Sequence, residues 1–132
     1  MVIIDKDIAI WVMAKVGRYL PEMTAIGDIK DGVLIAGIAF ETQNKNCMTG
    51  HQRIDAPPSK QFWINSADFI FNQAGCKKFS ALVEVQNEKA IKLNKHIGFV
   101  IEATLKDHGT NGDLLVMSLF KENCKFLRWI KQ

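Results

Sequence analysis

The sequence predicts an α/β (α+β) fold with a mixed, mostly antiparallel central sheet and helices on both faces. Of its 132 residues, 48% are hydrophobic and 23% are charged, which is the balance of a globular protein and not of a disordered chain. Strand and helix patterns alternate in the middle of the chain, so right-handed crossovers are expected there. No repeat or linker divides the sequence, which favours a single domain over residues 1–132.

The first half of the chain predicts one helix and three strands. Apolar residues recur at helical spacing after Asp5 and Asp7, either of which is a natural N-cap, and Pro21 stops the helix. The turn Asp31-Gly32 between two apolar runs is a strong hairpin signal. We therefore expect a helix over residues 7–19 and strands over residues 25–29, 33–40 and 47–54. The second of these strands is continuously apolar, as a strand covered on both faces would be.

The second half of the chain predicts two helices, three strands and a short tail. Pro57 and Pro58 end the preceding strand, and Ser59 is a natural N-cap for the helix that follows. Gly75 and Gly98 stand where glycines end helices. We expect helices over residues 59–74 and 88–97, strands over residues 79–86, 99–105 and 113–120, and a short helix or ordered tail over residues 123–132.

The net charge of +3 is unevenly distributed. The last twelve residues contain Lys121, Lys125, Arg128 and Lys131 against Glu122, so the body of the chain is neutral. A domain that binds duplex nucleic acid usually carries a broad basic face. The pattern favours a solvated basic tail, and it makes a nucleic-acid contact through that tail the minor hypothesis.

The cysteines, histidines and apolar runs argue against a disulfide-stabilised, a metal-binding and a membrane-spanning protein. Cys47, Cys76 and Cys124 are far apart and odd in number, so no disulfide framework is expected and a cytoplasmic location fits best. Cys47 and His51 are four residues apart without a second such pair, so no metal site is expected. No apolar run approaches the roughly 18 residues that a membrane span needs. Phosphate-loop, dinucleotide and nucleophile-elbow motifs are missing from the sequence.

The most specific pattern follows the predicted fifth strand. Asn87 caps a helix, Ala90 stands three positions later, the helix ends at Gly98-Phe99, and the next strand begins with V-x-E. This pattern resembles the GNAT acyltransferase family, in which the corresponding helix flanks coenzyme A. The resemblance covers about residues 79–127, and its C-terminal part is similar to a compact subgroup common in phages and prophages.

The resemblance implies an acetyl-CoA-dependent N-acetyltransferase acting on a primary amine. The cofactor would lie in a splay between the strands at 47–54 and 79–86, with its pantetheine arm on backbone groups of the former. Its pyrophosphate would lie at the N-terminus of the helix after Ser59. The cofactor-binding residues that the resemblance implies are Met48, Thr49, Arg53, Ser59, Lys60, Gln61, Asn87, Ala90 and Asn94. For Asn87, a purely capping role is the alternative.

Two departures from the family pattern favour an alternative function. The family's pyrophosphate loop reads Q/R-x-x-G-x-G/A, whereas residues 53–62 lack glycine and include Pro57 and Pro58, which cannot donate hydrogen bonds. Many family members carry a general-acid Tyr at the position of Asn94, and an amide is not a general acid. The alternative is a catalytically degenerate GNAT-fold binding protein of phage origin that acts through a protein partner.

Acetylation of an amine requires that the amine first lose a proton. His51 and Glu41 are the candidate bases on the central strands, because histidine titrates near neutral pH and Glu41 ends an apolar strand. Asn94 would orient the thiol of the cofactor, and water would protonate the leaving thiolate. Because no nucleophile stands out, we expect direct attack of the amine on the thioester.

The acceptor is either a small-molecule amine or a protein amine. In the family, acceptor pockets form from the N-terminal helix and variable loops, here residues 18–24 and 107–112. Trp129 and Ile130 in the tail are apolar, and they pack either on the body or on a second copy in a homodimer.

Overall fold

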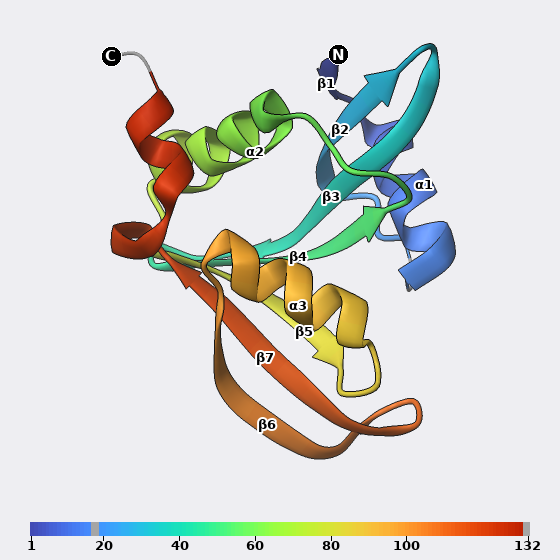
Figure 1. Ribbon diagram of the computed structural model, residues 1–132, viewed down its shortest axis with the longest axis vertical. Helices are drawn as coiled ribbons and strands as arrows, with labels where there is room; N and C mark the ends of the chain where they lie inside the picture. The colour runs from blue at the N-terminus through green and yellow to red at the C-terminus, as the bar shows by residue number, and fades with distance from the viewer. Residues whose placement is uncertain (17–18, 131–132) are drawn as a thin grey trace.

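The computed structural model describes residues 1–16 and 19–130, and Figure 1 shows how the elements are arranged. In chain order these are β1 (Val2–Ile4), α1 (Lys6–Val16), β2 (Thr24–Lys30), β3 (Val33–Gln43), β4 (Cys47–Ile54), α2 (Lys60–Ala67), the π-helical segment η1 (Asp68–Gln73), β5 (Lys78–Glu84), α3 (Glu88–Ile97), β6 (Val100–Gly109), β7 (Gly112–Phe120), and the short 3-10 segments η2 (Lys121–Asn123) and η3 (Lys125–Trp129).

The strands form one sheet. Within the described residues it has seven strands, in the order β1-β2-β3-β4-β5-β7-β6. Neighbouring strands are antiparallel except β4 and β5, which run parallel and are joined by the crossover through α2 and η1. The predicted mixed, mostly antiparallel sheet is confirmed.

Helices cover both faces of the sheet, as predicted. α1 packs on β2, β3 and β4, and two glycines let it approach closely. A Cβ atom on Gly37 would stand 2.8 Å from Cγ2 of Val12, and one on Gly27 would stand 2.8 Å from Cδ1 of Ile8. α2 and α3 lie on the opposite face, over the larger of two hydrophobic clusters (Figure 1). Below we call these two sides the α1 face and the α3 face.

The N-terminal region differs from the sequence prediction in two places. Val2–Ile4 forms the unpredicted edge strand β1, which pairs with β2; a three-residue strand is too short to show an alternating pattern. Of the helix expected over residues 7–19, the structure describes α1 as Lys6–Val16, and Tyr19 is not helical. Residues 17 and 18 lie outside the described residues.

The helix expected over residues 59–74 consists of two parts. α2 ends at Ala67, and the chain continues as the π-helical segment η1. At its end the N–H of Ala74 donates to the carbonyl of Phe69, a step of five residues in place of four. The wider step keeps Ile70 and Phe71 buried, at 3% and 1% exposure.

The C-terminal tail packs on α2 through η3, which is the packing on the body that the sequence analysis offered as one alternative. Lys131, counted in the basic tail, lies outside the described residues. None of the described helices has the length and the apolar character that crossing a membrane would require.

Candidate functional site

The strands β4 and β5 separate part-way along their length. They pair in parallel over four positions, of which the last is Gly50 opposite Ala81. Beyond this point β4 continues beside β3 to Ile54, while β5 continues beside β7 to Glu84. The strand edges that face each other there have no strand partner, so their backbone groups are open to a ligand. This opening lies where the family resemblance implies a splay.

The implied backbone contacts at Met48 and Thr49 do not match this geometry. Both residues pair with β5, opposite Phe79 and Ser80, and with β3 on their other side. The side chain of Met48 is 2% exposed in the hydrophobic core. Because the sheet occupies these backbone groups, the part of β4 that is open toward the splay is residues 52–54.

On the α1 face, His51 and Glu41 form a close pair at the base of the splay. His51 follows Gly50 and pairs with Ala39, whose side chain packs under α1. Glu41 lies where the register between β3 and β4 shifts, and a bulge of this kind re-aims a side chain. Nε2 of His51 is 2.6 Å from Oε2 of Glu41, and the side chains are 22% and 35% exposed. The two candidate bases are therefore one dyad, in which the carboxylate orients the ring.

On the α3 face, Asn94 lies above the same point of the sheet. Its side-chain nitrogen is 3.9 Å from Sδ of Met117, which pairs with Ala81 at the base of the splay. Asn94 is 1% exposed, and its Oδ1 has no hydrogen-bond partner among the described residues. A buried polar atom without a partner costs about 1–3 kcal/mol, so a donor from a ligand would stabilise this side chain.

Asn87 and Ala90 lie at the first turn of α3. Oδ1 of Asn87 accepts a hydrogen bond from the N–H of Ala90 at 3.2 Å, so Asn87 caps the helix. Ala90 is half-buried and packs against the larger cluster. The capping role that the sequence offered for Asn87 is observed.

A buried carboxylate occupies the start of α2. Oγ of Ser59 accepts from the N–H of Phe62 at 3.2 Å, which makes Ser59 the N-cap as predicted. The N–H of Ser59 itself donates to Oδ2 of Asp28 at 2.7 Å, and the amino group of Met1 is 3.3 Å from Oδ1 of Asp28. Asp28 is 2% exposed. Burial alone would raise its pKa, but the hydrogen bonds from Ser59 and the charge of the amino group lower it, so Asp28 is ionised at neutral pH.

The remaining implied phosphate ligands are already engaged within the protein. Arg53 lies on the α1 face, with its guanidinium 2.9 Å from Oδ2 of Asp55, 2.8 Å from the carbonyl of Trp11 and 3.8 Å from the Trp11 ring centroid. Nε2 of Gln61 donates to Asn65 at 2.5 Å. The ammonium group of Lys60 lies against the ring of Trp129 in the C-terminal tail. The backbone N–H groups of Lys60 and Gln61 have no acceptor among the described residues.

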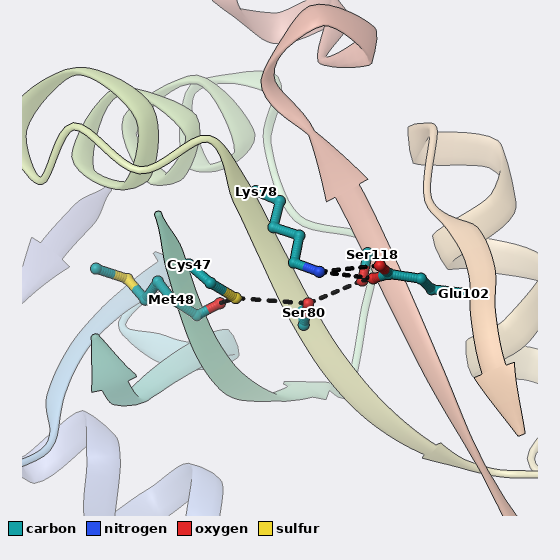
Figure 2. Close-up of polar contacts among 6 residues, drawn as sticks. All are labelled: Cys47, Met48, Lys78, Ser80, Glu102 and Ser118. Atoms are coloured by element: carbon teal, nitrogen blue, oxygen red, sulfur yellow. Dashed lines mark hydrogen bonds and ion pairs between the residues drawn. The ribbon is translucent and has the colours of Figure 1, made fainter. Parts of the chain in front are cut away.

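A polar network crosses four strands on the α1 face, beyond the cover of α1 (Figure 2). The thiol of Cys47 is 3.7 Å from Oγ of Ser80, which is 2.8 Å from Oγ of Ser118. Ser118 donates to Glu102 at 2.5 Å, and Lys78 donates to both carboxylate oxygens at 2.9 and 3.0 Å. The hydrogen bonds from Ser118 and Lys78 lower the pKa of Glu102.

Sequence reasoning missed both this network and Asp28. Ser80 and Ser118 stand in apolar strands, which was a usable signal, because a buried hydroxyl requires a partner. Asp28 interrupts the apolar strand β2 in the same way. Which residues pair with these buried polar groups depends on the order of the strands in the sheet, and the spacing of residues in the sequence does not reveal that order.

Comparison with solved structures identifies the fold. A variant of spermidine N-acetyltransferase SpeG from Vibrio cholerae superposes with a TM-score of 0.75 at 15% identity, over 98% of this chain and 98% of that one. Mutant forms of the spermidine/spermine N-acetyltransferase SpeG from the same organism give 0.73 at 15% identity, over 99% and 100%. This is the GNAT fold.

A third SpeG variant aligns at 20% identity, over 83% of this chain and 69% of that one, with a TM-score of 0.64. No family model matches the chain, and no curated protein matches it. At these identities, the structural similarity establishes the GNAT architecture and leaves the chemistry to the residues described above.

Proposed function

We propose that this protein is an N-acetyltransferase that transfers the acetyl group of acetyl-CoA to a primary amine. The observation that carries the proposal is the arrangement at the base of the splay. A His51–Glu41 dyad lies on one face. On the other lies Oδ1 of Asn94, which has no partner among the described residues, and open strand edges lie between the two. The fold shared with acetyltransferases of amines supports the proposal.

The residues present are compatible with the cofactor. The buried Oδ1 of Asn94 lacks a partner, and the edge of β4 at residues 52–54 has room for the amides of a pantetheine arm. We assign the pyrophosphate to the free N–H groups of Lys60 and Gln61, next to the cap at Ser59. Ala90, a small residue on α3, and the capping Asn87 complete the proposed contact set. Arg53 would join it after leaving Asp55.

Acetyl-CoA, when bound, supplies a thioester that an amine attacks directly. In our proposal, His51 takes a proton from the acceptor ammonium, and Glu41 holds the ring in position. Backbone N–H groups at the splay polarise the acetyl carbonyl. As the C–S bond of the thioester breaks, water protonates the leaving thiolate, and the hydroxide so formed takes the remaining proton from the amine nitrogen. Oδ1 of Asn94, on the α3 face, accepts a hydrogen bond from the thiol that results.

The acceptor that we propose to test first is a small cationic amine. The neighbours named above are spermidine and spermidine/spermine acetyltransferases, so polyamines belong in the first screen, with a protein N-terminus or lysine as the second class. Residues 19–24 and 107–112 are the segments that we assign to acceptor recognition, and within the second segment β6 continues to Gly109 and β7 begins at Gly112. Arg18, which begins the first of these loops in the sequence prediction, lies outside the described residues.

One observation favours a second candidate function. The carboxylate of Asp28 already occupies the N–H of Ser59, so the start of α2 holds an internal negative charge where the fold binds a phosphate. This contact favours loss of cofactor binding, and hence the alternative of a catalytically degenerate GNAT-fold binding protein that acts through a protein partner. Phage origin and a cytoplasmic location stay predictions of the sequence.

A thiol-release assay tests the proposed function. Purified protein is incubated with acetyl-CoA and a panel of amines, and free CoA is measured. We expect amine-dependent release that the variant His51→Gln lacks, while His96→Gln, on the exposed outer face of α3, keeps it. Binding of acetyl-CoA without release by any amine would support the binding protein instead.

A further inference from the structure

The C-terminal segment η3 runs beside α2 and reaches its first turn (Figure 1). Phe126 stacks on Trp63, with ring centroids 6.1 Å apart and an interplanar angle of 21°. One turn earlier in α2 and one turn later in η3, Nζ of Lys60 is 3.3 Å from the ring centroid of Trp129. The tail therefore places an indole ring at the start of α2, next to the two free N–H groups.

Trp129 is exposed and lies near two cations. Half of its surface, 49%, is open to solvent, which is unusual for the largest apolar side chain. The guanidinium of Arg128 is 5.5 Å from the ring centroid, in addition to the ammonium of Lys60. Neither cation forms an ion pair with a carboxylate of the described residues. Nothing in the fold of the described chain therefore neutralises these charges.

We propose that Trp129, Lys60 and Arg128 bind the nucleotide end of the donor, an adenine base with phosphate groups. An exposed indole offers a stacking surface for any base, and the two cations match the phosphates beside it. This inference rests on the proposed function, since it assigns the part of acetyl-CoA that lies outside the splay.

The inference explains how a phosphate could be bound at the start of α2, where few backbone N–H groups are free to donate. Pro57 and Pro58 have no N–H, and the N–H of Ser59 is held by Asp28, so only two backbone donors remain at this end. Stacking and side-chain charge from the tail add affinity where the backbone supplies less. Because α2 begins shortly after β4 ends, the Trp129 cluster lies on the helix end toward which the open part of the splay leads.

The test uses adenosine 3′,5′-bisphosphate as the probe, measured by calorimetry beside CoA and pantetheine. We expect wild-type protein to bind the bisphosphate and CoA, and Trp129→Ala to weaken both about tenfold, as loss of a base–aromatic stack does. Pantetheine binding is expected to stay unchanged. Trp129→Phe should keep most of the affinity, and Arg128→Gln should weaken bisphosphate binding and reduce its salt dependence. Val100→Ala, which removes an apolar side chain of similar exposure, 46%, from β6, is the matched control.

Equal bisphosphate affinity in wild type, Trp129→Ala and Arg128→Gln would overturn the inference. So would wild-type protein that binds pantetheine and CoA with equal affinity, and in that case the proposed function would stand. If wild type binds none of the three compounds, the proposed function itself fails. Should Trp129→Ala not fold, Trp129→Phe and Arg128→Gln decide the question.

Discussion

His51 and Glu41 come together because of one irregularity in β3. The register shift after Phe40 puts Glu41 opposite the strand position where β4 begins to leave β5, and the 2.6 Å contact results. A carboxylate at this distance restricts the ring to one orientation. The proposed base therefore has its direction fixed before an acceptor arrives.

Replacing His51 by Gln should lower kcat by about 10²–10⁴, the usual contribution of a general base, because the acceptor would lose its proton acceptor. Glu41→Gln should have a smaller effect, since the ring keeps a partner but loses the negative charge. Steady-state kinetics as a function of pH check both variants. A kcat for His51→Gln within twofold of wild type would remove the dyad from the mechanism.

Asp28 makes stability depend on pH. Its pKa is lowered in the folded protein, so its contribution is present above the unfolded-state value of about 3.9 and is lost as the pH falls through the folded pKa. Asp28→Asn should lower the free energy of unfolding at pH 7 by about 1.5–3 kcal/mol, the range for hydrogen bonds to a charged group. When the pH falls below 4, the variant should lose less of its remaining stability than wild type does.

Urea unfolding at pH 7 and pH 3 measures both effects of Asp28→Asn. Asp31→Asn is the control, because Asp31 is exposed in the β2–β3 turn and Asn tolerates its positive φ of 52°. Parallel pH dependence of wild type and Asp28→Asn would show that Asp28 is not responsible.

At the scale of elements, the splay depends on how firmly each strand is held by its other neighbour. β4 stays paired with β3 as far as Ile54, and β5 stays paired with β7 as far as Glu84. The Ser80–Ser118–Glu102 contacts join β5, β7 and β6 into one unit beside the opening (Figure 2). The network therefore holds one wall of the splay in place.

Ser118→Ala should destabilise the protein by about 1–3 kcal/mol, because Ser80 loses its hydroxyl partner and is left with the weak contact from the Cys47 thiol, and Glu102 loses one of its two donors and keeps only Lys78. Denaturant unfolding measures the loss, and a double-mutant cycle with Ser80→Ala should show coupling above about 0.5 kcal/mol. Ser66→Ala is the matched control, since Ser66 is equally buried but donates to a carbonyl of its own helix. A loss no larger than that of Ser66→Ala would contradict this role.

At the scale of the whole molecule, the sheet separates the proposed reacting groups. The His51–Glu41 pair lies on the α1 face and Asn94 on the α3 face, and the splay connects the two sides. In the proposed reaction, the acceptor approaches from one face while the thiol leaves on the other.

Much of this architecture could be predicted from the sequence. Turns and helix caps depend only on residues that are close in sequence, so the ends of helices and strands could be predicted from Gly32, Ser59, Asn87 and Gly98. The β1 strand and the π-helical step could not be predicted, since both depend on packing across the sheet. For the same reason His51 and Glu41 were named separately, and their contact became visible only with the strand register.

Acetyl-CoA should raise the thermal stability of the whole protein. A ligand at 100 times its Kd adds about 2.7 kcal/mol to the free energy of unfolding, a shift of several degrees for a domain of this size. A melting curve in 1 mM acetyl-CoA, about 100 times a Kd of 10 μM, against the same concentration of ATP measures it. An equal shift with both compounds would indicate non-specific anion binding.

Calorimetric titration of the wild-type protein with acetyl-CoA, with free CoA as the companion, tests the central claim most directly. Our account predicts saturable micromolar binding of both compounds at one site per chain. No heat of binding at millimolar acetyl-CoA would contradict it, and would mean that the GNAT fold has been kept while its chemistry has been lost.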